Sequence, residues 1–415
     1  MDMQRIASEI DPILETCRGK RVICFVQDRC DLDAQASVAV FDHILREKYE
    51  SKATCFYSKQ PTFLMNRRVE SELLSGMFQR TEESENLDER IESSPIITVF
   101  DAINFGMISS FSRVLNNDEF KEGSKPILLF DHHLDSNEAE EIADESPSAY
   151  GEKVKSIVLK AGANTSIMLS LMGELGVEFD PSNEKHKQIA MAAHIGIKID
   201  TEQFKKEYLT KIDEEACDTI NKLLDEEALD LIGQLEEIRT PVDWIIHKGR
   251  AFSHCRRFDS SVAAYGIGVI DDAGIIPYVA DALKETGFFT SVIVFGITHE
   301  LIDGKLHYVN LTASGRTVDN KQIDLLGVFK NVFYIRGKGG QKISKGGGRS
   351  SGIFGASAMT GAEIPLSHLL ESSVGDIRSY AWPMEAKKIR RRLMSQIKSL
   401  EKELVVLAEF DCENG

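Results

Sequence analysis

Long apolar runs are missing from this sequence of 415 residues. None of its apolar stretches approaches the roughly 18 residues that a membrane-spanning helix needs. Residues 1–5 are polar and lack the apolar segment of a secretory signal peptide. We therefore expect a cytoplasmic protein that does not interact with a membrane.

Paired cysteines and an excess of positive charge are missing as well. The seven cysteines are odd in number and include no CxxC pair, which predicts neither a disulfide framework nor a thiolate zinc site. The formal net charge of −17 disfavours broad, non-specific binding along nucleic acid, because such binding needs a basic surface. The same charge suits a site that gathers divalent cations, which then attract phosphate.

Strand-like apolar runs alternate with helical patterns, and the chain is longer than one hydrophobic core usually serves. This alternation predicts an α/β fold with a mostly parallel, doubly wound sheet, joined by a helical connector to a smaller α/β domain. The predicted limits are 1–211 for the first domain, 212–241 for the connector, 242–375 for the second domain and 376–415 for a C-terminal helix. Residues 33–49 are predicted to form an amphipathic helix.

The predicted C-terminal helix has apolar residues at spacings of three and four, together with several basic residues. The basic residues suit contact with nucleic acid. Such an apolar stripe more often packs on a core or pairs with another helix, so we favour docking or a homodimer.

Acidic residues follow several of the strand-like runs. The runs and the residues to which they lead are 21–26 with Asp31 and Asp33, 96–100 with Asp101, 127–130 with Asp131, His132 and His133, and 194–199 with Asp200. Open α/β sheets place their sites at the carboxyl ends of the strands, so we expect these groups to meet in one crevice.

Two divalent ions about 3.5 to 4 Å apart need several carboxylates, one of which bridges the ions, and such a pair promotes phosphoryl displacement. The carboxylates at the strand ends supply that number, and the nitrogen of His132 suits Mn²⁺ better than Mg²⁺ or Ca²⁺. Each acid alone also has a structural interpretation, since Asp33 can cap the helix that it opens and Asp101 can start a turn. Their convergence at separate strand ends favours the metal site.

Residues 337–361 contain nine glycines interleaved with lysines and one arginine. Glycine lets backbone N–H groups approach an anion, and the cations favour phosphate. A flexible surface loop is the alternative, because neither GxxxxGK[ST] nor GxGxxG is present.

Together these residues resemble the motifs of the DHH phosphoesterase family, which includes RecJ-like nucleases, in both order and spacing. Asp31-Leu32-Asp33-Ala34 resembles the first motif, Asp101 the second, Asp131-His132-His133 the third and Asp200 the fourth. The second domain resembles the DHH-associated substrate domain through Ser314-Gly315-Arg316 and the segment 346–357. The resemblance covers residues 20–370 and implies two lobes with a cleft between them.

The resemblance also implies a role for each matching residue. Asp31 and Asp101 would hold one Mn²⁺, with Mg²⁺ as an alternative metal. The second ion would be held by Asp33, Asp101, His132 and Asp200. Asp131 would orient a neighbouring imidazole, and Asp101 and His133 would be catalytic, with His133 touching the substrate phosphate. The substrate-binding residues would be Arg316, Gly347, Gly348 and Arg349.

Two positions depart from the family pattern. Gln27 stands four residues before the first acid, where the family has histidine, and Arg349 replaces a histidine after three glycines. An amide oxygen can still ligate a hard cation, so Gln27 stays among the predicted ligands, and neighbouring Asp28 is the alternative ligand. In either case we expect the first ion to be held more weakly or with a different metal preference.

We therefore expect a two-metal phosphodiesterase that hydrolyses nucleotides or short single-stranded oligonucleotides. The alternatives are a non-catalytic relative that binds nucleic acid or a protein partner, and a hydrolase of polyphosphate or pyrophosphate.

Overall fold

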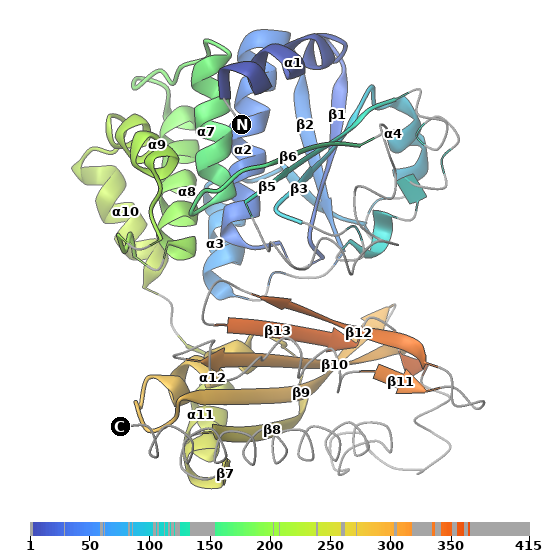
Figure 1. Cartoon of the computed structure of the whole chain (residues 1–415), viewed down its shortest axis with the longest axis vertical. Coiled ribbons are helices and arrows are strands. Elements are labelled where there is room, and N and C mark those ends of the chain that lie inside the picture. The colour runs from blue at the N-terminus through green and yellow to red at the C-terminus, as the bar shows by residue number, and fades with distance from the viewer. Residues whose placement is uncertain are drawn as a thin grey trace, which may run out of the picture. The chain divides into compact units, whose positions relative to one another are not determined.

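The computed structural model divides into two compact units, Met1–Ile238 and Arg239–Gly415 (Figure 1). It describes residues 3–132 and 154–317, and beyond them 334–336, 342–350, 355–360 and 364–365. Gaps within the two long ranges fall at 29, 59–60, 62, 82–83, 85, 103–104, 106–107, 112, 115–116, 118–119, 121–124, 202, 207, 238–239, 259–261, 271 and 303–304. The predicted C-terminal helix over 376–415 lies outside the described residues.

A six-stranded sheet forms the centre of the first unit. Its strands are β1 (Arg21–Val26), β2 (Lys52–Tyr57), β3 (Phe78–Arg80), β4 (Ile97–Phe100), β5 (Ile127–Asp131) and β6 (Val154–Val158). Their order is β3-β2-β1-β4-β5-β6, and every neighbouring pair runs parallel. This arrangement confirms the predicted doubly wound α/β fold.

The central strands β1, β4 and β5 consist mainly of apolar residues because both faces of the sheet are covered there. Along β1, the side chains of Val22, Cys24 and Val26 join one buried cluster, whereas Ile23 and Phe25 join another on the opposite face. The first cluster lies under α1 (Met3–Glu15), α2 (Leu32–Tyr49), α3 (Leu64–Glu72), α7 (Asn164–Glu174) and α8 (Glu184–Asp200). The second lies under α4 (Leu87–Ser93) and η3 (Ser109–Phe111).

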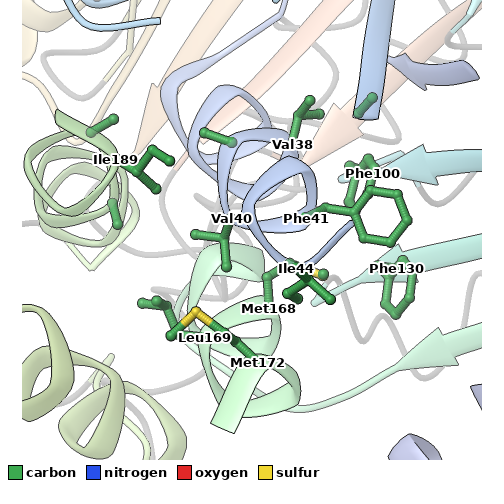
Figure 2. Packing of buried hydrophobic residues seen from close by; sticks show 14 of the residues in the cluster. Val38, Val40, Phe41, Ile44, Phe100, Phe130, Met168, Leu169, Met172 and Ile189 are labelled. Atoms are coloured by element: carbon green, nitrogen blue, oxygen red, sulfur yellow. The ribbon is translucent and has the colours of Figure 1, made fainter. Parts of the chain in front are cut away.

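Helix α2 is buried on nearly all sides, and the prediction that it is amphipathic is therefore wrong. Its Phe41 ring packs against Phe100 of β4 and Phe130 of β5, with ring centroids 5.2 and 6.3 Å apart. Figure 2 shows Met168 and Met172 of α7 beside the same helix. The sheet, α7 and α8 enclose α2 together, so its exposed residues, Arg46 and Glu47, occur only near its C-terminal end.

The predicted strand over 194–199 is also wrong, because α8 continues without a break from Glu184 to Asp200. Asn183 caps the start of this helix by accepting the backbone N–H of Lys185 at 2.9 Å. Gly196 lets α8 approach α2 closely, since a Cβ there would lie 3.1 Å from the Leu32 carbonyl oxygen. Asp200 consequently comes from a helix end and not from a strand end.

The stretch interpreted as a connector contributes two helices, α9 (Lys211–Asn221) and α10 (Glu226–Glu236). Helix α9 packs on α7 and α8, and α10 packs on α8, within the first unit.

The second unit is built on a mixed sheet with the strand order β11-β12-β13-β10-β9-β8-β7. Its strands are β7 (Arg256–Phe258), β8 (Val262–Ile270), β9 (Ser291–Ile302), β10 (Lys305–Thr317), β11 (Tyr334–Arg336), β12 (Lys342–Ser350) and β13 (Gly355–Thr360), with β14 (Ile364–Pro365) paired to β10. Only β8 and β9 run parallel among these neighbours. Helix α12 (Ile275–Lys284) packs on β9 and β10, and α11 (Val242–His254) packs on α12.

Among the residues described, no helix combines the length and the apolar character that crossing a membrane requires.

The close approach of α2 and α8 leads to a test of the fold. We expect Gly196→Val to lower the free energy of unfolding by about 2 kcal/mol, because the added side chain must push against Leu32 and Ala36. The matched change Gly173→Val, at an exposed position with nothing within 4 Å, should stay within about 0.5 kcal/mol of the wild type. Urea unfolding measures both, and equal losses would contradict the predicted helix contact.

Candidate metal centre

The strand order reverses between β1 and β4, and this switch point holds the candidate site. Chain order runs outward from β1 through β2 to β3 on one side, and from β4 through β5 to β6 on the other. Loops leaving β1 and β4 therefore diverge at the carboxyl ends of the strands, the place where open α/β sheets bind their ligands. Gln27 follows β1, and Asp101 follows β4.

Asp101 is fully buried and has a left-handed backbone with φ of 50°. This conformation is unfavourable in free energy for any residue that has a Cβ, and residues that adopt it are common at functional sites. The Asp101 backbone N–H donates to the Phe130 carbonyl oxygen at 2.9 Å, which extends the pairing of β4 with β5 by one residue. The turn places the Asp101 carboxylate across from His132, which follows β5.

Asp33 lies in the first turn of α2 and is also fully buried. Its two carboxylate oxygens accept the backbone N–H groups of Asn164 at 2.6 Å and Thr165 at 2.8 Å. These are the first residues of α7, whose N-terminal end favours a negative charge. The alternative that Asp33 caps the helix it opens is therefore wrong, because Asp31 is the cap of α2 and the Asp33 carboxylate binds the N-terminal end of α7.

The imidazole of His132 lies at the centre of the candidate site. Its Nδ1 donates to the Ala161 carbonyl oxygen at 3.2 Å, and a carbonyl can only accept, so the neutral ring carries its lone pair on Nε2. This Nε2 faces Asp33 Oδ2 at 3.6 Å, Asp101 Oδ1 at 3.5 Å and Asp200 Oδ2 at 3.3 Å. A backbone oxygen behind a ligating imidazole is the usual support of a metal-binding histidine.

The spacing of these atoms fits a shared cation. Ligands about 2.1 Å from one ion lie about 3.0 to 3.5 Å from each other, depending on whether the geometry is octahedral or tetrahedral. Asp33, Asp101 and His132 place their ligating atoms within 4.8 Å of one another. One nitrogen and three carboxylates are thus available to hold a divalent ion, and the residues present fit such a group.

The pKa values of the cluster also favour a bound cation. Burial, with the nearby Asp200 carboxylate, raises the pKa of Asp33 to about 7. Burial acts to lower the pKa of His132, but the carboxylates of Asp101 and Asp200 outweigh it and hold that pKa well above its ordinary value. Asp200 ends α8, where the helix dipole disfavours a negative charge. The negative charge gathered here is stabilised by protons or by a cation.

A further buried carboxylate, that of Asp213, holds the loop whose carbonyl group orients His132. Asp213 accepts the backbone N–H groups of Gly162 at 2.8 Å and Ala163 at 3.3 Å, next to the Ala161 carbonyl that orients His132. Gly162 has no room for a side chain, since a Cβ there would lie 2.7 Å from both Thr201 Cγ2 and the Tyr208 carbonyl oxygen. These contacts fix the loop between β6 and α7.

The structure brings the side chains of Gln27 and Asp31 together beside Asp101. Asp31 caps α2 through Oδ1, which accepts the Ala34 backbone N–H at 3.0 Å. The side-chain amide nitrogen of Gln27 donates to Asp31 Oδ2, and it also donates to Asp101 Oδ2 at 3.4 Å. The amide therefore presents its N–H groups, and not its oxygen, to the two carboxylates.

The other predicted site residues are distributed differently. Asp131 is buried at the end of β5, and its predicted role in orienting an imidazole stays a prediction. His133 lies outside the described residues. In the second unit, Arg316 of β10 donates from Nε to Asp281 Oδ1 at 2.5 Å and from Nη1 to Ser314 Oγ at 2.8 Å.

The glycine-rich stretch forms strands in part, since Gly347, Gly348 and Arg349 lie on β12 and pair with β13. Their predicted contact with substrate phosphate, like that of Arg316, stays a prediction.

His43, Glu47 and His186 form another group of side chains with metal-ligand chemistry. His186 Nδ1 accepts the Asp180 backbone N–H at 2.9 Å, and its Nε2 faces the Asn183 amide at 3.3 Å. His43 Nε2 contacts the Glu178 carbonyl oxygen at 3.1 Å, and burial lowers its pKa. Protein groups already engage these nitrogens, so we interpret this group as packing.

Sequence reasoning missed the groups that act through their backbone. Asn164 and Thr165 hold Asp33, and Ala161 holds His132, with atoms that every residue type carries. Asp213 had a signal, because Thr210-x-x-Asp213 is the spacing of a capping box at the start of α9.

Comparisons with known proteins support the fold. No protein-family model matches the sequence, and no curated protein matches it. An exopolyphosphatase-related protein from Bacteroides fragilis aligns with a TM-score of 0.63 and 13% identity over 96% of this chain and 98% of its own.

Two RecJ structures align less well. RecJ from Thermus thermophilus in complex with Mn²⁺ has a TM-score of 0.44 and 12% identity, over 95% of this chain and 54% of RecJ. An exonuclease RecJ bound to manganese has a TM-score of 0.40 and 13% identity, over 87% of this chain and 90% of its own. The chain therefore shares the fold of the exopolyphosphatase-related protein.

The pKa values in the cluster predict how metal affinity changes with pH. Below about pH 7, an ion must displace the proton of Asp33, and the His132 proton as well. We therefore expect Mn²⁺ affinity to rise with pH between about 5.5 and 8, by at least about tenfold per unit below 7. Calorimetric titration of the full chain measures this, and a flat profile would contradict the cluster as the binding site.

Proposed function

We propose that the protein is a metal-dependent phosphoesterase that hydrolyses phosphodiester bonds in nucleotides or short oligonucleotides. The observation that carries the proposal is the position of His132 Nε2, which lies 3.3 to 3.6 Å from oxygens of three carboxylates at the switch point of the sheet. Ligand crevices of open α/β folds occur at this place, and the fold is one that phosphoesterases use.

Mn²⁺ is the metal that suits this ligand set best, because imidazole nitrogen combined with carboxylate oxygen favours a transition metal over Mg²⁺. A divalent ion held by Asp33, Asp101, His132 and Asp200 would polarise a phosphoryl oxygen and lower the pKa of a nearby water.

The burial and the backbone contacts of the ligands indicate how they are held and from which side solvent reaches them. Asp33 and Asp101 are fully buried, and the backbone contacts of Asp33 and the φ of Asp101 hold their carboxylates in place. Asp200 has a side chain 26% exposed, against 11% for His132 and 0% for Asp33, so solvent reaches the cluster on the Asp200 side. We assign the entry of substrate and of the attacking water to that side.

Contacts with the substrate complete the proposal. His133 follows His132 in the chain, and the resemblance of Asp131-His132-His133 to the family motif supports a contact between His133 and the substrate phosphate. Arg316 provides a planar guanidinium, which binds phosphate well through two N–H groups. Its present partner is Asp281, so binding a phosphate would require Arg316 to exchange that carboxylate for the phosphate.

Hydrolysis of polyphosphate or pyrophosphate is the second candidate function. It is favoured by the structural neighbour from Bacteroides fragilis, which is described as exopolyphosphatase-related. The same four metal ligands serve either reaction, because both displace a group at phosphorus beside a divalent ion.

A panel assay tests the proposal and separates the candidates. The full chain would be incubated with short RNA, short DNA, a cyclic dinucleotide, polyphosphate and pyrophosphate while Mn²⁺ is titrated. We expect Mn²⁺-dependent turnover of a nucleotide substrate, and a loss of about a hundredfold or more in Asp101→Asn, because that change removes one charged ligand.

Asp230→Asn is the matched control, since Asp230 is exposed on α10 and should leave turnover unchanged. Turnover of polyphosphate or pyrophosphate alone would favour the second candidate. A chain that binds Mn²⁺ but turns over none of the substrates would contradict the enzyme proposal and favour a non-catalytic relative.

A further inference from the structure

We infer that this centre holds a single divalent ion, because the side-chain amide of Gln27 occupies the position at which a second ion would bind. The inference rests on the proposed metal centre and departs from the two ions that the sequence resemblance implies. It concerns the space between Asp31 and Asp101, on the far side of Asp101 from His132.

The amide nitrogen of Gln27 lies between two acids. It donates to Asp31 Oδ2, and to Asp101 Oδ2 at 3.4 Å. An amide has two N–H groups on its nitrogen and only lone pairs on its oxygen. With a carboxylate on each of two sides, the nitrogen is the end that is attracted, and the oxygen would be repelled. The observed orientation therefore follows from the charges around Gln27.

Asp101 shows the difference between the two positions most clearly. A carboxylate that bridges two ions gives one oxygen to each. Asp101 Oδ1 faces His132 Nε2 at 3.5 Å, and oxygens of two further carboxylates lie 3.3 and 3.6 Å from the same nitrogen. Asp101 Oδ2 faces the N–H of Gln27, a donor that already supplies the partial positive charge. The carboxylate thus bridges an ion position and an amide.

Both carboxylate oxygens of Asp31 likewise accept hydrogen bonds from the protein. Its Oδ1 accepts the Ala34 backbone N–H at 3.0 Å as the cap of α2, and its Oδ2 accepts from Gln27. To bind a second ion, the amide would have to turn its oxygen inward and give up both hydrogen bonds to carboxylates. The ion would gain a neutral oxygen, Asp31 and a share of Asp101, which is a poorer set than the four ligands around His132.

Gln27 is therefore a positioning residue. By holding Asp31 and the outer oxygen of Asp101, it keeps Asp101 Oδ1 directed at the ion position beside His132. The donor set between Asp31 and Asp101 does not fit a second ion, and hydrolysis would depend on one.

The number of ions can be counted without any assay of activity. Equilibrium dialysis of the full chain against Mn²⁺ gives the number bound, and the electron paramagnetic resonance spectrum distinguishes an isolated Mn²⁺ from two coupled ions. We expect one ion per chain and the spectrum of isolated Mn²⁺ for the wild type. Gln27→His should restore a ligand nitrogen between Asp31 and Asp101, so we expect this variant to take up a second, coupled ion.

Gln234→His is the matched control, because Gln234 is exposed on α10 and its substitution should leave the count at one. Two ions in the wild type would overturn the inference while leaving the proposed function intact. One ion in both the wild type and a folded Gln27→His would overturn the assignment to Gln27. A wild type that binds none would contradict the metal centre itself.

A second variant keeps the test decisive if Gln27→His does not fold. Asp31→Asn preserves a good helix cap and removes only the charge. With a single ion beside His132, its dissociation constant should change less than about threefold, since Asp31 is not a ligand there. A loss of bound Mn²⁺ from Asp31→Asn would show that the ion lies between Asp31 and Asp101, and would overturn the inference.

Discussion

The first unit depends on one electrostatic constraint, which is the confinement of three carboxylates around a single imidazole with little access to solvent. Asp33 and Asp101 are fully buried, and Asp200 is partly exposed. Burying charges of the same sign is unfavourable unless protons or a cation balance them, and the raised pKa of Asp33 reflects this cost. Removing the cluster would remove this cost, but it would also remove the groups on which the proposed metal site depends.

The surrounding fold is arranged to sustain this constraint. The N-terminal end of α7 places two N–H groups on Asp33, the loop held by Asp213 places a carbonyl on His132, and the close packing of α8 on α2 brings Asp200 to the cluster. The parallel sheet contributes the switch point and the turn at Asp101. Each of these elements thus orients one polar group of the cluster. Helix α2 lies between the sheet and two of the helices involved, and it is buried on nearly every side.

The sequence predicted the strands of the first unit well, because β1, β4 and β5 are short apolar runs that stop at polar residues. It failed over 194–199, where Ile195, Ile197 and Ile199 alternate with other residues in the period of a strand, although packing against α2 at Gly196 keeps this stretch helical. The side chains of the cluster around His132 were predictable because their residue types, aspartate and histidine, are common metal ligands. Their supports were not, because Ala161, Asn164 and Thr165 act through the backbone.

The central claim is that His132 and the three carboxylates bind a divalent ion. A crystal structure of the full chain grown with Mn²⁺, with diffraction recorded on both sides of the manganese absorption edge, tests this claim most directly. We predict an anomalous peak within about 2.3 Å of His132 Nε2 and of carboxylate oxygens from Asp33, Asp101 and Asp200. A crystal with no peak at this position, or with its peak between Asp31 and Asp101, would contradict the account.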